Sequence, residues 1–433
     1  MKTIEYILIL LIITGGNTFM RYASADEITK LKLDNGLTLI YKKIEPLPIV
    51  NVQLFLTLGT ANDPAGKLGL TCMMQTLMVK GTKTMTEKQL STEIESMGGS
   101  IGASALEDYC EVSLNITKQY FDEAFKLFAD VVQNPAFPED ELKKEKVNMI
   151  AGIKSRQDQI FSVTYDCLRS AVYHGHPYTY LTTGTEEGVN NITRGDLQSW
   201  HGKHYGTQNM IMVVTGNIGL GEIKSAVKNY LGTMPPVEPL KYEFPAVEPV
   251  AKEIAEKKKF EQAYLMYGYL VPSVSDNDFP KIKVLNAYLG SGMSSLLFQE
   301  LREKAGLGYE VSSFYPSKKD KSTFIIYIGL DKSTMDTAKT KIEALISDLK
   351  TKPLDETRLR DAKKYIKGIS VLDHQTGSKQ AWYLGWWEIM GKGYRYDKKY
   401  LSDIEQVTSA DVKAMIDKYL TDKFVQVQIT PEK

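Results

Sequence analysis

The chain contains few cysteines and carries no excess charge of either sign. Only three of its 433 residues are cysteine, too few for the disulfide framework of a small secreted domain. Cys72, Cys110 and Cys167 are therefore expected to be buried free thiols, with a Cys72–Cys110 bridge as the alternative. Lysine plus arginine and aspartate plus glutamate both total 53. With neither a basic excess nor a basic stripe, no nucleic acid is expected as a partner.

The sequence also lacks an apolar run long enough to cross a membrane. The run Ile7–Ile13 is far shorter than the roughly 20 apolar residues that a spanning helix needs. Ala23-Ser24-Ala25 offers a cleavage site with small residues, so residues 1–25 are expected to be a signal peptide of an exported, periplasmic protein. Glu5 and Arg21 are unusual in such a segment, and an uncleaved membrane tether is the alternative.

What is present is an internal repeat. The segments that start at Phe121 and Met335 each predict an amphipathic helix, a proline-marked break and a second helix that begins with acidic residues. Further on, Thr193 and Thr408 each precede an aspartate by three residues, the pattern of a helix N-cap. Matches at a nearly constant offset predict a duplicated domain of about 210 residues per copy, an ordinary domain size.

Strands precede helices within each copy. This order predicts an α+β fold of two homologous sandwich domains, each a mostly antiparallel sheet with helices packed on one face. A proline-dense stretch separates the copies, which gives the expected division into residues 26–233, a linker at 234–255, and residues 256–433. The expected elements are strands at Thr38–Lys42, Val50–Leu58, Met210–Thr215 and Phe424–Ile429, a strand pair within Ser100–Ile116, and a helix at Leu68–Val79.

The helix from Gly69, with its Lys80-Gly81-Thr82 turn, resembles the signature helix of the pitrilysin/insulinase family of zinc peptidases. The resemblance extends from about Lys32 to the C-terminus. Within the family, the chain is similar to the bacterial branch that resembles mitochondrial processing peptidase. It also includes His176-Pro177-Tyr178, Gly184-Thr185, Gly216-Asn217 and the segment Leu289–Tyr315.

The family's zinc motif is not retained. In that family the helix carries His-x-x-Glu-His, which places two zinc ligands and a general base on one helix face. The corresponding positions here are Cys72, Gln75 and Thr76. The family's third ligand, a glutamate, is expected near Ala151-Gly152, but no acidic residue occurs between Lys146 and Gln157. The resemblance therefore implies no metal site and no cofactor in this chain, and no peptide hydrolysis by the chain alone.

The histidine pairs His201/His204 and His174/His176 offer no replacement metal site, because neither comes with a third ligand. An active peptidase that uses Cys72 as a nucleophile is a weak alternative, because no histidine partner can be assigned to it.

A second family feature is present. Arg302 and Tyr309, seven residues apart around Gly306 and Gly308, match an arginine and a tyrosine that reach into the family's active site. The resemblance implies that Arg302 binds a substrate carbonyl or carboxylate and that Tyr309 stabilises an oxyanion. The alternative is that Arg302 forms a structural salt bridge and Tyr309 is a buried strand aromatic.

Loss of the zinc motif together with a retained arginine and tyrosine resembles the non-zinc subunit of the family's two-chain peptidases. The resemblance implies a heterodimer with a zinc-bearing sister subunit, zinc in that partner, and an extended peptide substrate bound by β-augmentation. A homodimer is left open. The alternative function is a catalytically inert structural or binding protein of the same fold.

Overall fold

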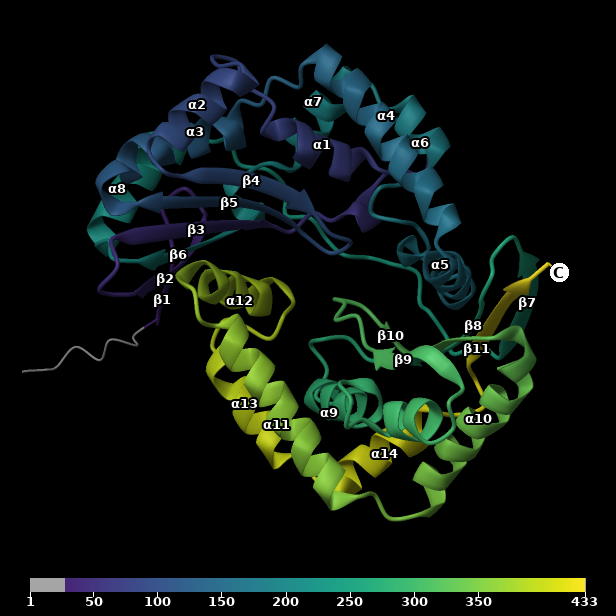
Figure 1. The fold of residues 1–433 in the computed structure, drawn as a ribbon. Coiled ribbons are helices and arrows are strands. Elements are labelled where there is room, and N and C mark those ends of the chain that lie inside the picture. Colours follow the sequence, from purple (N-terminus) through teal and green to yellow (C-terminus); the bar gives the residue numbers. More distant parts are fainter. Residues whose placement is uncertain (1–27, 433) are drawn as a thin grey trace, which may run out of the picture.

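The computed structural model describes residues 28–432 and contains two sheets (Figure 1). The first sheet has six strands in the order β1-β2-β6-β3-β5-β4, and the second has five in the order β7-β11-β8-β10-β9. The strands of the first sheet are β1 Ile28–Lys32, β2 Thr38–Lys43, β3 Ile49–Leu56, β4 Ser100–Ala105, β5 Cys110–Thr117 and β6 Met210–Gly216. Those of the second are β7 Lys252–Lys258, β8 Ala263–Val271, β9 Gly308–Phe314, β10 Ser322–Leu330 and β11 Val425–Pro431. The proposed signal peptide lies outside the described residues.

The two sheets repeat one topology, which confirms the predicted α+β class and its mostly antiparallel sheets. In the first sheet β2 pairs with β6 in parallel, and in the second β7 pairs with β11 in parallel. All other pairs are antiparallel. Thus β2-β6-β3-β5-β4 corresponds strand by strand to β7-β11-β8-β10-β9, and β1 is an addition to the first copy.

The helices also repeat, and both predicted caps are present. Thr193 accepts a hydrogen bond from the Asp196 amide at the start of α7, and Thr408 accepts one from the Asp411 amide at the start of α14. At both helix starts the aspartate carboxylate also accepts a hydrogen bond from the threonine amide, which completes a capping box. Two otherwise free amides are thereby satisfied at each helix start. The helices up to residue 231 are α1 Leu70–Met78, α2 Glu87–Ser96, α3 Phe121–Gln133, α4 Glu139–Ser155, α5 Ile160–Val172, α6 Glu186–Asn191, α7 Arg194–His204 and α8 Leu220–Leu231. Those that follow are α9 Phe279–Gly290, α10 Met335–Thr351, α11 Glu356–Asp373, α12 Gly377–Ile389, α13 Tyr396–Gln406 and α14 Ser409–Tyr419.

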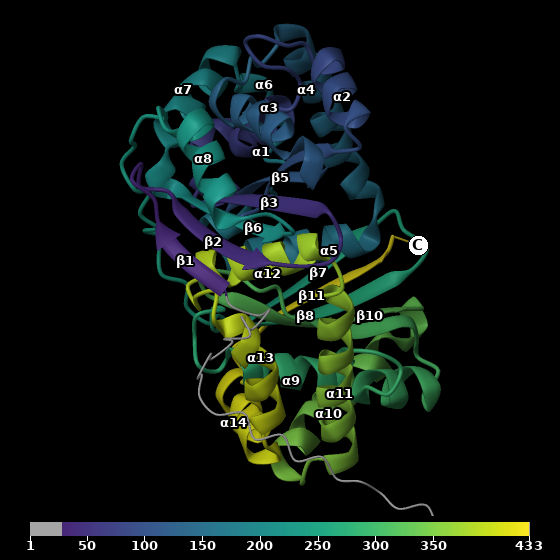
Figure 2. The same ribbon diagram turned by 90° about the vertical axis from the view of Figure 1, so that its left-hand side faces the viewer.

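Each copy places one helix against the sheet of the other copy. Helix α12 packs on β3 and β6 of the first sheet, whereas α5 packs on β8 and β11 of the second (Figures 1 and 2). Gly385 permits the first contact, because a Cβ there would lie 2.0 Å from the ring of Phe55. The expectation of helices on one face is therefore incomplete, since each sheet has a helix from the opposite copy on its second face.

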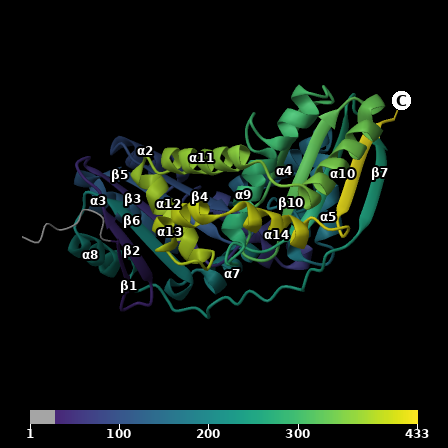
Figure 3. The same ribbon diagram turned by 90° about the horizontal axis from the view of Figure 1, so that it is seen from below.

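The segment between the copies is extended. Residues 235–251 contain no helix or strand, and Figure 3 shows this stretch running from the side of α8 to β7. The Leu240 amide donates to Asn209 at 3.0 Å, so the segment is fixed to the first copy. Strand β7 begins at Lys252, inside the range expected to be linker, because this strand pairs with β11 along its full length.

Candidate functional site

Helix α1, which the sequence resemblance aligned with the family's zinc-motif helix, begins at a tight junction. Gly69 has φ 100°, and a Cβ there would lie 2.7 Å from the Thr183 carbonyl oxygen. Asp63 caps the helix by accepting hydrogen bonds from the amides of Gly69 at 2.8 Å and Thr71 at 3.0 Å. Burial raises the pKa of the Asp63 carboxyl to about 6, although these hydrogen bonds act in the opposite direction. Asp63 holds the helix start and was not found by sequence analysis, because it lies outside the motif.

The motif positions on α1 make contacts within the protein. Gln75 is fully buried, and its amide nitrogen donates to the Tyr205 hydroxyl. The hydroxyl of Thr76 donates to the Cys72 carbonyl oxygen at 3.1 Å, one turn earlier on the same helix. An amide cannot accept a proton from water as a carboxylate does. Gln75 and Thr76 therefore fit neither a general base nor a zinc ligand.

Cys72 is a protonated thiol at neutral pH. Burial raises its pKa to about 11, and the negative charges of Asp63 and Glu145 raise it further. A thiol in such surroundings is a poor metal ligand and a poor nucleophile. Glu145 lies on α4 just before the range in which the third zinc ligand was sought. Sequence analysis therefore did not predict that Glu145 lies near Cys72. Within residues 28–432, no group of three His, Cys, Asp or Glu side chains is arranged to hold a metal ion.

The three cysteines are free in the structure, as the favoured interpretation predicted, but only Cys110 is fully buried, whereas Cys72 and Cys167 are partly exposed. Burial also raises the pKa of the Cys110 and Cys167 thiols. All three are therefore protonated thiols near neutral pH.

The histidine pairs have structural surroundings. His201 lies 2.9 Å from the Val132 carbonyl oxygen, and the His204 ring packs edge-on against Trp200. Burial lowers the pKa of both imidazoles to about 4. His176 is buried and contacts Asp320 at 3.3 Å, whereas His174 is exposed. Neither pair has the surroundings of a metal site.

The segment around Arg302 and Tyr309 is built by a helix-ending turn. The short π-helical segment η7 (Phe298–Glu303) ends where the Leu307 amide donates to the Leu301 carbonyl at 2.9 Å and the Gly306 amide donates to the Arg302 carbonyl at 3.1 Å. These two nested bonds close the end of the helix, with Gly306 in the left-handed region at φ 61° and with Leu301 and Leu307 both buried. The turn leads directly into β9, so the sequence spacing of the arginine and the tyrosine follows from it.

Both side chains are on the surface and lack polar partners in the described part of the chain. The Arg302 guanidinium lies 5.0 Å from the Phe298 ring and forms no ion pair. Tyr309 is 65% exposed, and its hydroxyl makes no hydrogen bond. The structure therefore does not support the alternative of a structural salt bridge and a buried strand aromatic. Tyr309 also lies on β9, an edge strand of the second sheet.

The structure does not bring the two candidate sites into contact. Helix α1 belongs to the first copy and β9 to the second, and no hydrogen bond, ion pair or ring contact within residues 28–432 links Arg302 or Tyr309 to α1 (Figure 1). The two sites are separate surfaces of one chain.

Comparison with known proteins identifies the family. Residues 38–186 match the model described as insulinase (peptidase family M16), and residues 191–366 match the model described as the peptidase M16 inactive domain. The chain therefore belongs to the peptidase M16, or insulinase, family.

Among named relatives, an uncharacterized zinc protease of Rickettsia bellii is 27% identical over 86% of this chain and 89% of its own length. The uncharacterized zinc protease YmxG of Bacillus subtilis is 24% identical over 93% of this chain and 98% of its own length. A Helicobacter pylori relative, 22% identical over 90% of this chain and 91% of its own, is named non-peptidase homolog YmxG. The relatives thus include chains named as proteases and one named as a non-peptidase.

Solved structures share the fold over almost the full length. The peptidase M16 inactive domain from Pseudomonas fluorescens superimposes with a TM-score of 0.88 at 22% identity, covering 94% of this chain and 98% of that chain. A Helicobacter pylori protease gives 0.86 at 21% identity, covering 94% and 100%. In the described residues, no helix is long and apolar enough to cross a bilayer.

Proposed function

We propose that this chain is the non-zinc subunit of a two-chain metallopeptidase and supplies Arg302 and Tyr309 to an active site whose zinc is held by a sister chain. The main support for this proposal is that both side chains are exposed and have no polar partner in the described residues. The Gln75 amide and the Thr76 hydroxyl, in contrast, form hydrogen bonds within the protein. Polar groups that are left free beside a hydrogen-bonded turn suit a role in contact with another molecule.

The chemistry of the pair supports this assignment. A guanidinium presents several donors in a fixed plane, which suits a peptide carbonyl or a carboxylate. A tyrosine hydroxyl is a donor for the oxyanion that develops when a peptide bond is attacked. An extended peptide can add to β9 through main-chain hydrogen bonds, because β9 is paired on one side only.

The test is a reconstitution assay with a sister M16 chain that has an intact His-x-x-Glu-His motif. The expected result is no peptide cleavage by this chain alone, cleavage on mixing, and a fall in kcat/KM of about a hundredfold or more with Arg302→Ala. Arg360→Ala is the matched control, since Arg360 is an exposed arginine on α11 of the same copy.

Two other outcomes would overturn the proposal. Zinc-dependent cleavage by this chain alone would contradict it directly. A stable mixed complex whose cleavage rate is indifferent to Arg302→Ala would instead support an inert structural subunit.

We also propose that the chain is exported to the periplasm after removal of residues 1–25. Cell fractionation with N-terminal sequencing tests this. A new N-terminus at Asp26 is the expected result, and an uncleaved membrane-bound chain would indicate a tether.

A further inference from the structure

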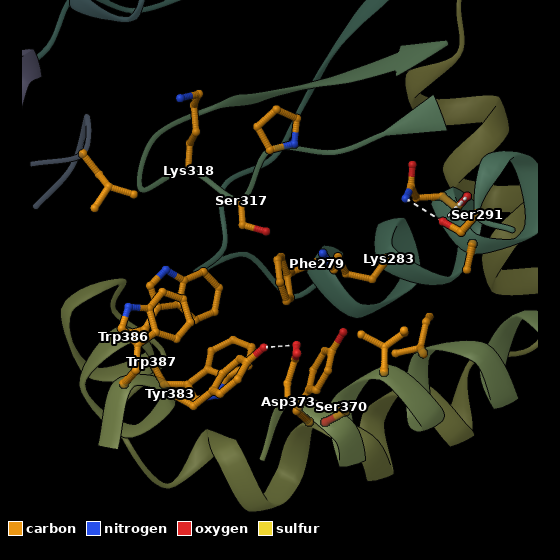
Figure 4. A pocket seen from close by; sticks show the side chains of 18 of the residues that line it. Phe279, Lys283, Ser291, Ser317, Lys318, Ser370, Asp373, Tyr383, Trp386 and Trp387 are labelled. Atoms are coloured by element: carbon orange, nitrogen blue, oxygen red, sulfur yellow. Dashed lines mark hydrogen bonds between the residues drawn. The ribbon is translucent and has the colours of Figure 1, made fainter. Parts of the chain in front are cut away.

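A cavity of about 580 Å³ lies where the two copies meet. One wall is the turn between β4 and β5, and the others come mainly from α9, α11, α12 and the connection between β9 and β10, with one tyrosine each from α5 and α13. Figure 4 shows side chains that line this cavity. This volume is in the range of small-molecule sites. The cavity includes none of the α1 motif positions and neither Arg302 nor Tyr309, so it is separate from both candidate sites.

Aromatic rings form much of the cavity wall. Trp386 and Trp387 pack at 4.6 Å between ring centroids, and Phe279 meets Trp387 edge-on at 5.9 Å. Trp382 stacks on Trp386 at 5.7 Å. Figure 4 shows Trp386 and Trp387 on one side of the cavity, beside Tyr383. Such a surface favours a flat or branched apolar group.

One cation projects into this apolar space without a counter-ion. The ammonium of Lys283 lies 5.9 Å from the centre of the Phe279 ring and 5.8 Å from that of Tyr315. Within residues 28–432, Lys283 forms no hydrogen bond or ion pair, and burial lowers its pKa. Ser317 also points into the cavity, and its hydroxyl makes no hydrogen bond in the described structure (Figure 4).

The acidic groups of the wall already have partners. Glu107 forms an ion pair with Lys318 at 3.0 Å. The Asp108 carboxylate accepts from the Tyr178 hydroxyl and from the Lys319 amide. Asp373 accepts from the Tyr383 hydroxyl at 2.6 Å. Asp108 and Asp373 accept from neutral donors and keep their charge, but none of the three carboxylates pairs with Lys283. The Lys283 ammonium lies among apolar rings without a counter-ion in the described residues.

We propose that this cavity binds a carboxylate attached to an aromatic or branched apolar group, with the carboxylate at Lys283 and Ser317 and the apolar group against the rings of α12. The shared chemistry can come from the C-terminal residue of a peptide or from a free aromatic acid. This site is independent of the proposed peptidase function, because it uses neither Arg302 nor Tyr309 and needs no partner chain.

Binding in this cavity can be measured by tryptophan fluorescence. Three of the four tryptophans of the chain, Trp382, Trp386 and Trp387, line the cavity, and Trp200 does not. Tryptophan fluorescence of the full chain is titrated with 3-phenylpropanoate, N-acetyl-Ala-Ala-Phe and the C-terminal amide of the same tripeptide. Saturable changes are expected with the acids, and binding about ten- to a hundredfold weaker with the neutral amide.

The variants isolate the charge. Lys283→Met is expected to weaken acid binding by about ten- to a hundredfold, and Lys283→Arg to retain it. Lys341→Met, at an exposed lysine of α10, is the control and is expected to change nothing. An unchanged melting curve of Lys283→Met excludes unfolding, and the Lys283→Arg result keeps the test decisive if the methionine variant fails to fold.

Each outcome decides the matter. Tighter binding of the peptide acid assigns the site to peptide C-termini, and tighter binding of phenylpropanoate assigns it to free acids. Equal binding of acid and amide, unchanged acid affinity in Lys283→Met, loss of acid binding in Lys283→Arg, or no saturation by any acid would overturn the proposal.

Discussion

Helix α1 in the first copy and the turn before β9 in the second differ in whether their polar side chains are hydrogen-bonded within the protein. On α1, the Gln75 amide and the Thr76 hydroxyl donate to groups of the protein itself. At the turn, Arg302 and Tyr309 are exposed and lack polar partners in the described chain. The first arrangement contributes to folding, whereas the second contributes little to it and leaves both groups free for another molecule.

The comparison shows how differently two polar regions of one duplicated fold contribute to stability. A buried polar group must be hydrogen-bonded or it costs stability, so the hydrogen bond of the buried Gln75 amide is part of the core. A surface group has no such requirement. Substitutions in the two regions should therefore separate effects on rate from effects on stability.

The largest expected effect is on rate. In the complex with a zinc-bearing sister chain, Tyr309→Phe should lower kcat by about 10²–10³-fold, because one oxyanion donor is worth about 3–4 kcal/mol. The free energy of unfolding should stay unchanged, since the hydroxyl makes no bond in the described structure. Tyr120→Phe, at a tyrosine 38% exposed in the first copy, is the control. Equal rates for both variants would remove the distinction between the two regions.

The converse is expected at α1. Gln75→Met should destabilise the chain by about 1–3 kcal/mol in urea unfolding, because the buried Tyr205 hydroxyl loses its partner. It should leave the cleavage rate of the complex unchanged. Thr76→Val, which removes only a bond to the same helix, should cost less. A rate loss in Gln75→Met with normal stability would show that α1 still takes part in the reaction.

The histidines give the two copies opposite responses to pH. The folded-state pKa of His204 is about 4, below the unfolded value of roughly 6.5, so unfolded chains take up protons first and stability falls as the pH falls between these values. His204→Phe should recover about 1–2 kcal/mol of the stability that the wild type loses from pH 7 to 4.5, as measured by urea unfolding.

His374 in the second copy has the opposite sign. Burial lowers its pKa, but the hydrogen bond and charge of Asp397 outweigh this and raise it above its ordinary value. Its contribution is present below the unfolded pKa and lost as the pH rises. His374→Gln should therefore destabilise the chain more at pH 5 than at pH 8, and the same trend in both histidine variants would contradict the assignment.

The smallest effect tests the equivalence of the copies. Thr193→Ala and Thr408→Ala should each cost about 1 kcal/mol in urea unfolding, because each removes the same N-cap bond, at 3.2 Å and 3.1 Å. Thr340→Ala, whose hydroxyl bonds only to its own helix, is the control. A large difference between the two cap variants would show that the copies differ in stability despite their common topology.

Local sequence patterns determined much of this fold. The caps at Thr193 and Thr408 were predicted because capping is decided by residues three apart. The strand pair within Ser100–Ile116 was predicted because apolar alternation and a polar turn are local signals, and it is present as β4 and β5. The packing of α5 on the second sheet and of α12 on the first was not predicted, because no local signal in a helix indicates which of two similar sheets it will cover.

The candidate sites divide in the same way. The sequence by itself determined that Cys72, Gln75 and Thr76 do not form a His-x-x-Glu-His motif and that Arg302 and Tyr309 are seven residues apart, because both are matters of residue identity. Only the tertiary structure decided that Glu145 lies near Cys72 and that the copies enclose a cavity around Lys283. Those relations join segments far apart in the chain. They depend on how helices and sheets pack, and this packing leaves Lys283 without an ion-pair partner in the described residues.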